Sequence, residues 1–232
     1  MTIKENYTRR HVKNFHWKKY LFQLFGVYIV ALPVLWLFYR IELRGAHNVP
    51  KNQKFICSPN HISYLDPFIA AYAIKKPLAF MAKKELFDNE KLAKTIDALG
   101  AFAVNREKLE VSTIKTALDI FKTKNWVLGI FPQGGIRKNK TIEQINKGFA
   151  AIAKTVKVDI LPISIIGVEQ YNWIPFKGKI IVEVGELISH NQEIDEIIDE
   201  WGRKIAEISG YNYVTTKEEQ EQKEEAEKLL HV

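Results

Sequence analysis

After residue 40, short apolar runs alternate with longer segments in which apolar residues recur at helical spacing. Short apolar runs are typical of buried strands, and the longer periodic segments are typical of amphipathic helices. Their alternation predicts an α/β fold with a mixed, largely parallel sheet flanked by helices. The predicted strands are Ile41–Arg44, Phe55–Ser58, Leu78–Ala82, Phe102–Val104, Val127–Phe131, Ile160–Ile165 and Ile180–Val184, and the predicted helices are Pro67–Lys75, Glu90–Leu99, Val111–Lys122, Ile142–Thr155 and Glu193–Ile208.

The segment Tyr20–Tyr39 is apolar on every face, with Gln23 as its one strongly polar side chain. As a helix it would be about 30 Å long, which matches the hydrocarbon core of a bilayer. A signal peptide has a shorter apolar region and a small-residue cleavage site, and a buried core helix does not need Tyr and Trp near its ends. We therefore predict a membrane-anchoring helical segment over residues 1–39, a folded domain over 40–210 and a charged tail over 211–232.

The cations before the apolar run place that end in the cytoplasm by the positive-inside tendency. A simple span would then export everything after residue 40, whereas a re-entrant or interface-lying helix bent at Gly26 or Pro33 would not. The sequence leaves both topologies open. The cations concerned are Arg9, Arg10, Lys13, Lys18 and Lys19, in a stretch that can lie on the membrane surface.

Charge is unevenly divided along the 232 residues, with eight Lys/Arg against two Asp/Glu in residues 1–50, 21 against 13 in 51–190, and five against 12 in 191–232. Positive charge beside an apolar segment suits anionic lipid headgroups and phosphorylated substrates. No helix-turn-helix, RNA-binding strand or zinc-finger pattern accompanies it, so we expect no nucleic-acid partner. Cys57 is the lone cysteine and no Cys/His cluster has zinc spacing, so neither a disulfide nor a metal is expected.

The segment CSPNHISYLDPF, residues 57–68, follows a predicted strand and contains His61 and Asp66. On a continuous helix these two side chains would lie about 140° apart. Asp66-Pro67 is a helix-start signal, however, so residues 61–65 should form a turn that folds back on Asp66. The carboxylate can then accept from one imidazole nitrogen and leave the other free as a base. On spacing alone, the alternative is that Asp66 only caps the helix and that His61 is an ordinary loop residue.

NHISYLD at 60–66 matches the NHxxxxD motif of the glycerolipid acyltransferases, and the chain resembles the 1-acylglycerol-3-phosphate (lysophosphatidate) acyltransferase family. The resemblance covers roughly residues 40–190 and includes MAKKELF at 81–87, GAFAVNR at 100–106, FPQGGIR at 131–137, KGFA at 147–150 and LPISI at 161–165. It implies a mixed α/β sheet with a hydrophobic acyl tunnel and a membrane-seated N-terminus.

The resemblance also implies an activity: transfer of a fatty acyl group from a thioester to the free hydroxyl of lysophosphatidate, which gives phosphatidate. His61 would take the hydroxyl proton while Asp66 orients the imidazole, without a covalent acyl-enzyme or a cofactor. Acyl-coenzyme A or acyl-acyl carrier protein would be the co-substrate, and membrane lipids and a lysophospholipid acceptor the partners. Cytoplasmic donors imply an inner (cytoplasmic) membrane location with the active site facing the cytoplasm.

Several cations and glycines are candidates for holding a phosphate. Arg137 can form paired hydrogen bonds to phosphate, and Gly134 and Gly135 allow close backbone approach and are possible oxyanion donors. Arg106 and Lys84 follow other strands, and such junctions converge on one edge of an open sheet. Solvated surface charges are the alternative. Asn60, Pro132 and Gln133 belong to the same motifs and are expected to support the site.

Three residues depart from the family pattern: Gln133 replaces the usual glutamate, Gly135 a threonine and Asn105 an aspartate that is often found there. A different lysolipid or lipid-linked amine as acceptor is therefore an alternative, and so is a catalytically silent lipid-binding protein of the same fold. Cys57 and Ser63 near His61 raise the possibility of a nucleophilic hydrolase. A buried strand position for Cys57, and a turn without elbow glycines for Ser63, argue against it.

Overall fold

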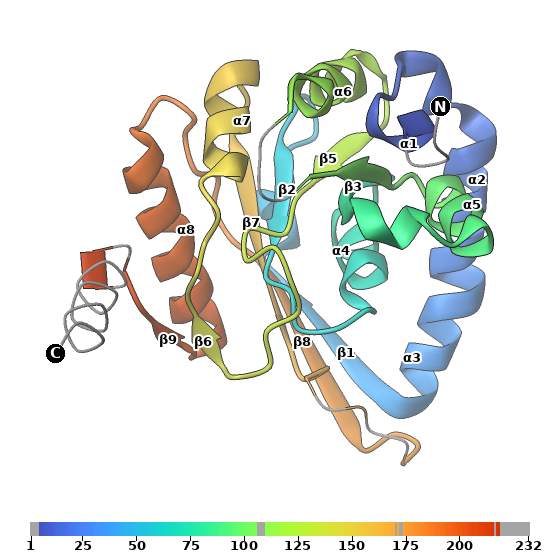
Figure 1. Cartoon of the computed structure of the whole chain (residues 1–232). Coiled ribbons are helices and arrows are strands. Elements are labelled where there is room, and N and C mark those ends of the chain that lie inside the picture. Colours follow the sequence, from blue (N-terminus) through green and yellow to red (C-terminus); the bar gives the residue numbers. More distant parts are fainter. Residues whose placement is uncertain (1–4, 106–109, 170, 172–173, 216, 219–232) are drawn as a thin grey trace, which may run out of the picture.

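The computed structural model describes residues 5–105, 110–169, 171, 174–215 and 217–218. Its centre is a seven-stranded sheet in the order β1-β8-β7-β2-β5-β3-β4 (Figure 1). All neighbouring strands in it are parallel except β7 and β8, which confirms the mixed, largely parallel sheet. The strands are β1 (Tyr39–Arg44), β2 (Ile56–Pro59), β3 (Leu78–Lys83), β4 (Phe102–Val104), β5 (Val127–Gly129), β7 (Ile160–Ile166) and β8 (Gly178–Val184).

Helices cover both faces of this sheet. Successive strand residues point to opposite faces, so Cys57 of β2 packs with α4 and the N-terminal helix, whereas Ile56 packs with α6, α7 and α8. The two larger apolar cores therefore lie one on each side of the sheet. The helices of the domain are α4 (Asp66–Ile74), α5 (Glu90–Ala98), α6 (Val111–Lys122), α7 (Gly148–Val156) and α8 (Ile194–Ser209), with short α1 (Glu5–Thr8) and the 3-10 turns Val12–Asn14, Ala46–Asn48 and Lys84–Phe87.

The helix predicted over Ile142–Thr155 is wrong at its start, because α7 begins only at Gly148. Thr141–Ile142 instead forms a two-stranded ladder, β6, with β9 (Asn212–Tyr213). Asn146 explains the late start, since its backbone and side-chain amides both donate to the carbonyl of Pro132, at 2.9 Å each. That attachment holds the chain in a loop despite the helix-like spacing of its isoleucines. The folded part of the chain thus extends to Tyr213, inside the predicted tail.

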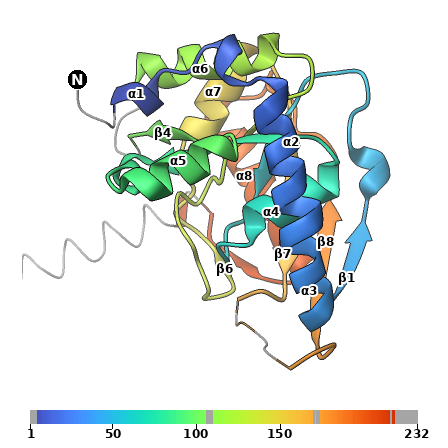
Figure 2. The ribbon, with the colours of Figure 1, turned by 90° about the vertical axis from the view of Figure 1, so that its right-hand side faces the viewer.

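The N-terminal segment forms one long helix, made of α2 (Trp17–Phe25), a π-helical stretch (Gly26–Ala31) and α3 (Leu32–Phe38). It runs along the outer side of the domain, in front of α4 (Figure 2). By length and composition, the helical segment Val12–Phe38 could cross a membrane: it contains an 18-residue window with a mean hydropathy of 2.1, and 28% of that window is buried. This fits the predicted anchor.

One face of the long helix is docked on the domain. The Gln23 amide donates to the carbonyls of Leu78 (2.8 Å) and Leu99, and accepts from the Leu78 amide at 2.8 Å. Because these bonds are buried, they fix the helix against the start of β3. The remaining face is apolar and exposed, and it comprises Leu21, Phe22, Phe25, Ile29, Val30, Val34, Trp36 and Leu37.

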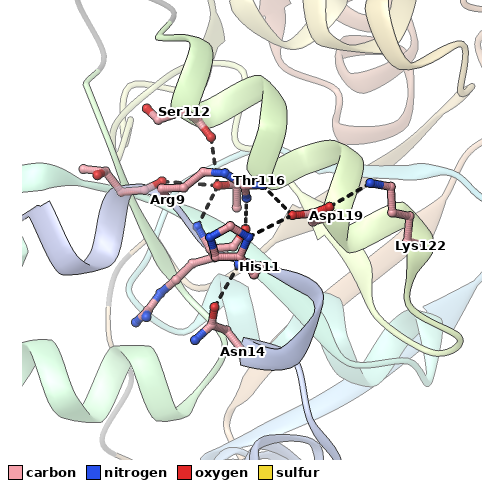
Figure 3. A network of polar contacts seen from close by, with 9 residues as sticks. Arg9, His11, Asn14, Ser112, Thr116, Asp119 and Lys122 are labelled. Carbon is pink, nitrogen blue, oxygen red and sulfur yellow. Dashed lines mark hydrogen bonds and ion pairs between the residues drawn. The ribbon is translucent and has the colours of Figure 1, made fainter.

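The chain before this helix is held by two aspartates of the domain. Asp119 of α6 pairs with Arg9 at 2.6 Å and with Lys122 at 3.0 Å (Figure 3). Asp97 of α5 pairs with Arg10 and, at 2.7 Å, with Lys19. Three of the five cations expected to face lipid are therefore paired with the protein itself.

Candidate active site

The turn that carries His61 is built by Asn60, which follows β2. The buried Asn60 side chain donates to the carbonyl of Ile165 at 2.9 Å and accepts from the Ile165 amide at 2.7 Å. The Asn60 side chain thus makes the hydrogen bonds to β7 that a strand backbone would make, at the point where β2 ends. The backbone amide of Asn60 also donates to the carbonyl of Ile163, at 3.2 Å. The chain can therefore leave the sheet at His61 without leaving polar groups of β7 unpaired.

His61 and Asp66 are in contact, as expected for a turn that folds back. Asp66 begins α4, one residue before the predicted start, and its Oδ2 lies 2.8 Å from His61 Nδ1. The same oxygen accepts from the backbone amides of Ile62 at 2.7 Å and Ser63 at 2.8 Å. Because Nδ1 is engaged by the carboxylate, Nε2 is the nitrogen left for a substrate.

The pair lies in a low-dielectric setting. The Asp66 side chain is fully buried and that of His61 is 13% exposed. Burial raises the pKa of Asp66, and the hydrogen bonds from His61, Ser63 and Ile62 oppose that rise. An ionised carboxylate here favours a positive charge on the adjacent imidazole, which is the form that a general base reaches after taking a proton.

The FPQGGIR loop after β5 holds the His61 backbone from both sides. The His61 amide donates to Gln133 Oε1 at 3.2 Å, and the His61 carbonyl accepts from the Arg137 amide at 2.7 Å. Holding the amide requires only an acceptor oxygen at position 133, so glutamine can take the place of glutamate in this contact. The Phe131 ring of the same loop stacks on the His61 ring, a contact that the sequence did not suggest.

The two glycines of this loop differ in what their positions require. Gly134 has φ +64°, and a Cβ there would lie 2.6 Å from Asn146 Nδ2, so the position needs glycine. Its amide donates to the carbonyl of Phe131 at 3.0 Å, which weakens its candidacy as an oxyanion donor. A Cβ at Gly135 would meet open space, and this glycine lines a cavity beside His61. Of the two, Gly135 is the better placed donor.

Two cavities flank the loop. The first has a volume of about 410 Å³, and its lining includes His61 and mostly apolar side chains from α4, β3, α5 and the N-terminal helix. Gln23 and Val27 are the contribution of that helix. The second, of about 290 Å³, is bounded by β4, the FPQGGIR loop and the start of α7, and it is lined by Asn105, Thr113, Asn146 and Lys147 among others. Phe131 and Met81 line both cavities.

The candidate phosphate-binding cations come from junctions at one edge of the sheet, because β2, β3, β4 and β5 are parallel. Arg137 donates to Gln144 Oε1 at 2.7 Å, while its buried Nε has no partner among the described residues. Lys84 is half-buried in the 3-10 turn after β3, and its neighbour Lys83 is the lysine that lines the first cavity. Arg106 lies outside the described residues.

The alternative nucleophiles are not available for catalysis. Cys57 is fully buried in β2, and burial raises the pKa of its thiol far above the usual value. Ser63 is buried, and its hydroxyl accepts from the Leu65 amide at 3.2 Å. Among the described residues no group of three or more His, Cys, Asp or Glu side chains could hold a metal ion. The chemistry of the site therefore centres on His61 and Asp66.

A family model described as Acyltransferase matches residues 40–166, more than half of the chain. The chain belongs to this acyltransferase family, which confirms the resemblance found in its motifs. It is 34% identical over 150 residues to the 1-acyl-sn-glycerol-3-phosphate acyltransferase of Streptococcus pneumoniae, a match that covers 62% of this chain and 55% of the relative. The enzyme of that name from Bacillus subtilis is 28% identical over 149 residues, 63% of this chain and 72% of the relative.

The crystal structure of the 1-acyl-sn-glycerophosphate acyltransferase PlsC from Thermotoga maritima has the same fold. It superposes with a TM-score of 0.59 and 23% sequence identity over 80% of this chain and 77% of that one. At this identity the likeness bears on the fold alone. The matched region spans little more than half the length of the Streptococcus relative.

Proposed function

We propose that this protein transfers a fatty acyl group from an acyl thioester to the free hydroxyl of lysophosphatidate and so forms phosphatidate. The observation that carries the proposal is the imidazole of His61, held at Nδ1 by the buried Asp66 carboxylate and lying on the wall of an apolar cavity. The names of the relatives in Streptococcus and Bacillus support the same acceptor.

In the proposed mechanism His61 Nε2 takes the proton of the acceptor hydroxyl while that oxygen attacks the thioester carbonyl carbon. The tetrahedral oxyanion then collapses, the carbon–sulfur bond breaks, and the thiolate leaves with the proton returned from the imidazolium. Asp66 stabilises the imidazolium between these steps. The amide of Gly135 has no hydrogen-bond partner among the described residues and is our candidate donor to the oxyanion.

The first cavity suits the acyl chain of the donor, because its lining is mainly apolar and His61 stands on its wall. Ile96, Leu99 and Phe68 line it together with Val27 of the N-terminal helix. An acyl chain bound there would carry its carbonyl carbon toward the imidazole. Both donors, acyl-coenzyme A and acyl-acyl carrier protein, are part of the proposal, because either would present its acyl chain as a thioester.

We assign the acceptor phosphate to the edge of the sheet where Arg137 follows β5. Arg106 stays a candidate on its sequence alone, because it lies outside the described residues. The unpartnered Nε of Arg137 supports the assignment, since a buried guanidinium donor without a partner favours an anionic ligand. The second cavity is bounded by β4 and the loop after β5 and is more polar than the first, with Asn105 and Asn146 on its wall. It is the candidate space for the glycerol phosphate.

Membrane association is part of the proposal, because the substrate and product are lipids and the long helix exposes a continuous apolar face. The other face of that helix is bonded to the domain through Gln23. A helix docked along its length favours an interface-lying anchor over a simple span. We infer that the protein sits on the cytoplasmic side of the inner membrane, where acyl thioesters are supplied.

An assay of purified protein against a panel of lysolipids, with both acyl donors, tests this function. We expect phosphatidate formation from lysophosphatidate and a KM for this acceptor that rises about ten- to a hundredfold in Arg137→Gln, with little change in the donor KM. Arg137→Lys should recover only part of the loss, because lysine cannot make paired contacts. Preference for an acceptor without phosphate, or equal effects on donor and acceptor, would reject the lysophosphatidate assignment.

A further inference from the structure

Three aromatic rings from three different segments form a continuous stack that ends on His61. The rings of His61 and Phe131 have centroids 4.0 Å apart and planes 18° from parallel. The rings of Phe131 and Phe80 follow at 4.8 Å and 10°. His61 comes from the turn after β2, Phe131 from the loop after β5 and Phe80 from β3. The stack therefore joins the imidazole to the sheet through side chains alone.

The inner end of the stack is fixed by the backbone of β5. Gly129 faces the Phe80 ring, and a Cβ at Gly129 would lie 2.6 Å from two of its carbons. Phe80 is 7% exposed and packs in the core shared with α4. The carbonyl of Phe131 accepts from the Gly134 amide, which holds the loop in place beneath the ring. Phe131 is thus supported both by a ring behind it and by its own backbone.

This stack supplies a restraint that Asp66 does not. The hydrogen bond from Nδ1 to Asp66 fixes one atom of the imidazole, but the ring can still tilt about that bond. A flat ring against its face limits the tilt, because ring stacking at 4.0 Å requires nearly parallel planes. We propose that Phe131 is a positioning residue that sets the plane of the His61 imidazole, and with it the direction of Nε2.

The position of Phe131 between the two cavities gives this restraint a functional meaning. Its ring lines both cavities, whereas the imidazole stacked on it lines the first cavity. If the acyl chain and the acceptor occupy the two sides, as in the proposed function on which this inference rests, the plane of the imidazole decides whether Nε2 reaches the acceptor hydroxyl.

The test combines kinetics with a direct readout of the ring. In protein with isotope-labelled histidine, the NMR signals of the His61 ring are identified by their absence in His61→Ala. Protons above an aromatic face are shifted upfield, so Phe131→Leu should move these signals downfield, and Phe131→Tyr should leave them upfield. We expect Phe131→Leu to lower kcat about tenfold or more with both KM values within about twofold, and Phe131→Tyr to restore most of it. Gly129→Ala displaces Phe80, the ring behind Phe131. It should shift the His61 signals and lower kcat in the same direction as Phe131→Leu, but by a smaller amount.

Phe15→Leu is the control, because Phe15 is also a ring with an aromatic partner, Trp126 at 5.5 Å, and lies away from His61; it is buried, whereas Phe131 is partly buried. It should leave the His61 signals and kcat unchanged. Unmoved His61 signals in Phe131→Leu would overturn the stacking role, and a rise in KM with unchanged kcat would make Phe131 a substrate-lining residue only. If the wild-type protein transfers no acyl group, the proposed function fails, and the NMR comparison still decides whether Phe131 sets the ring.

Discussion

Asn60 shows how a motif residue can serve the site without touching a substrate. Its amide is fully buried and replaces a strand residue opposite Ile165, so the next residue, His61, leaves the sheet at a fixed point. Gln133 also holds His61, because its side-chain oxygen accepts from the His61 backbone amide. The geometry of the imidazole therefore depends on neighbours that hold its backbone as well as on Asp66.

Asn60→Ala should destabilise the fold and reduce activity together. The change leaves both the amide and the carbonyl of Ile165 buried without their partner, which costs about 1–3 kcal/mol for such groups. Thermal unfolding of the purified variant measures this. Asn191→Ala, at an exposed position, is the control and should stay within about 0.5 kcal/mol of wild type. Equal melting temperatures for the two variants would contradict the role given to Asn60.

Asp119 of α6 is one of the two aspartates that hold the chain before the long helix. Burial alone would raise its pKa, but hydrogen bonds from Arg9 and Lys122 outweigh burial and hold the pKa of Asp119 below its usual value (Figure 3). A carboxyl whose pKa is lower in the folded state stabilises the fold above its unfolded pKa, and that contribution is lost as the pH falls through the folded value.

Asp119→Asn should therefore lower stability at neutral pH by about 1.5–3 kcal/mol, the range for hydrogen bonds to charged groups. The difference from wild type should shrink as the pH falls below about 4, the ordinary pKa of aspartate, because the carboxyl of the unfolded wild-type chain then takes up a proton, and it should vanish once the pH has passed the lower pKa of the folded state. Denaturant unfolding of both proteins at a series of pH values checks this. A difference that is constant with pH would show that the ion pairs of Asp119 do not contribute.

The elements of the domain were largely predictable because each is marked by its own residues. The apolar runs of the seven central strands and the Asp66-Pro67 helix start are local signals, and the structure has these elements within about two residues. The late start of α7 was not predictable, because it depends on Asn146 bonding to Pro132, which is distant in the sequence. The pairing of β6 with β9 is non-local in the same way.

In the candidate site, too, the features that depend on local sequence were predictable and the non-local ones were not. The turn from His61 to Asp66 was predictable because proline after aspartate fixes where α4 begins. Phe131 and Phe80 were not identified as site residues, since their rings meet only when β2, β3 and β5 are neighbours in the sheet. Gln23 could have been found from the sequence, because it is the lone strongly polar side chain in an apolar run. In the structure it lines the first cavity and donates to the Leu78 carbonyl of β3.

At the scale of the whole molecule, the long helix gives the protein one distinct apolar side. Leu21, Phe25 and Ile29 are 50%, 55% and 61% exposed and follow one another at intervals of about one helical turn. The same helix lines the first cavity through Val27 and Gln23. The proposed membrane surface and the proposed acyl site thus share one element, which would let a lipid substrate pass between them over a short distance.

Replacing Leu21, Phe25 and Ile29 together with Gln should weaken binding to anionic lipid vesicles, because each buried apolar side chain contributes about 1.5–3 kcal/mol. Sedimentation with vesicles measures the bound fraction. Val111→Gln is the control, since Val111 is 66% exposed but lies on α6, on the other face of the sheet. Equal vesicle binding by the triple variant and the control would rule out this face as the anchor.

In the proposed mechanism His61, oriented by Asp66, is the general base of an acyl transfer to lysophosphatidate. The most direct measurement is phosphatidate formation from lysophosphatidate and an acyl thioester by wild type, His61→Ala and Asp66→Asn, with thermal unfolding of each. We predict that His61→Ala lowers kcat about 10²- to 10⁴-fold, that Asp66→Asn lowers it less, and that both remain folded. Near wild-type turnover by a normally folded His61→Ala protein would rule out His61 as the general base.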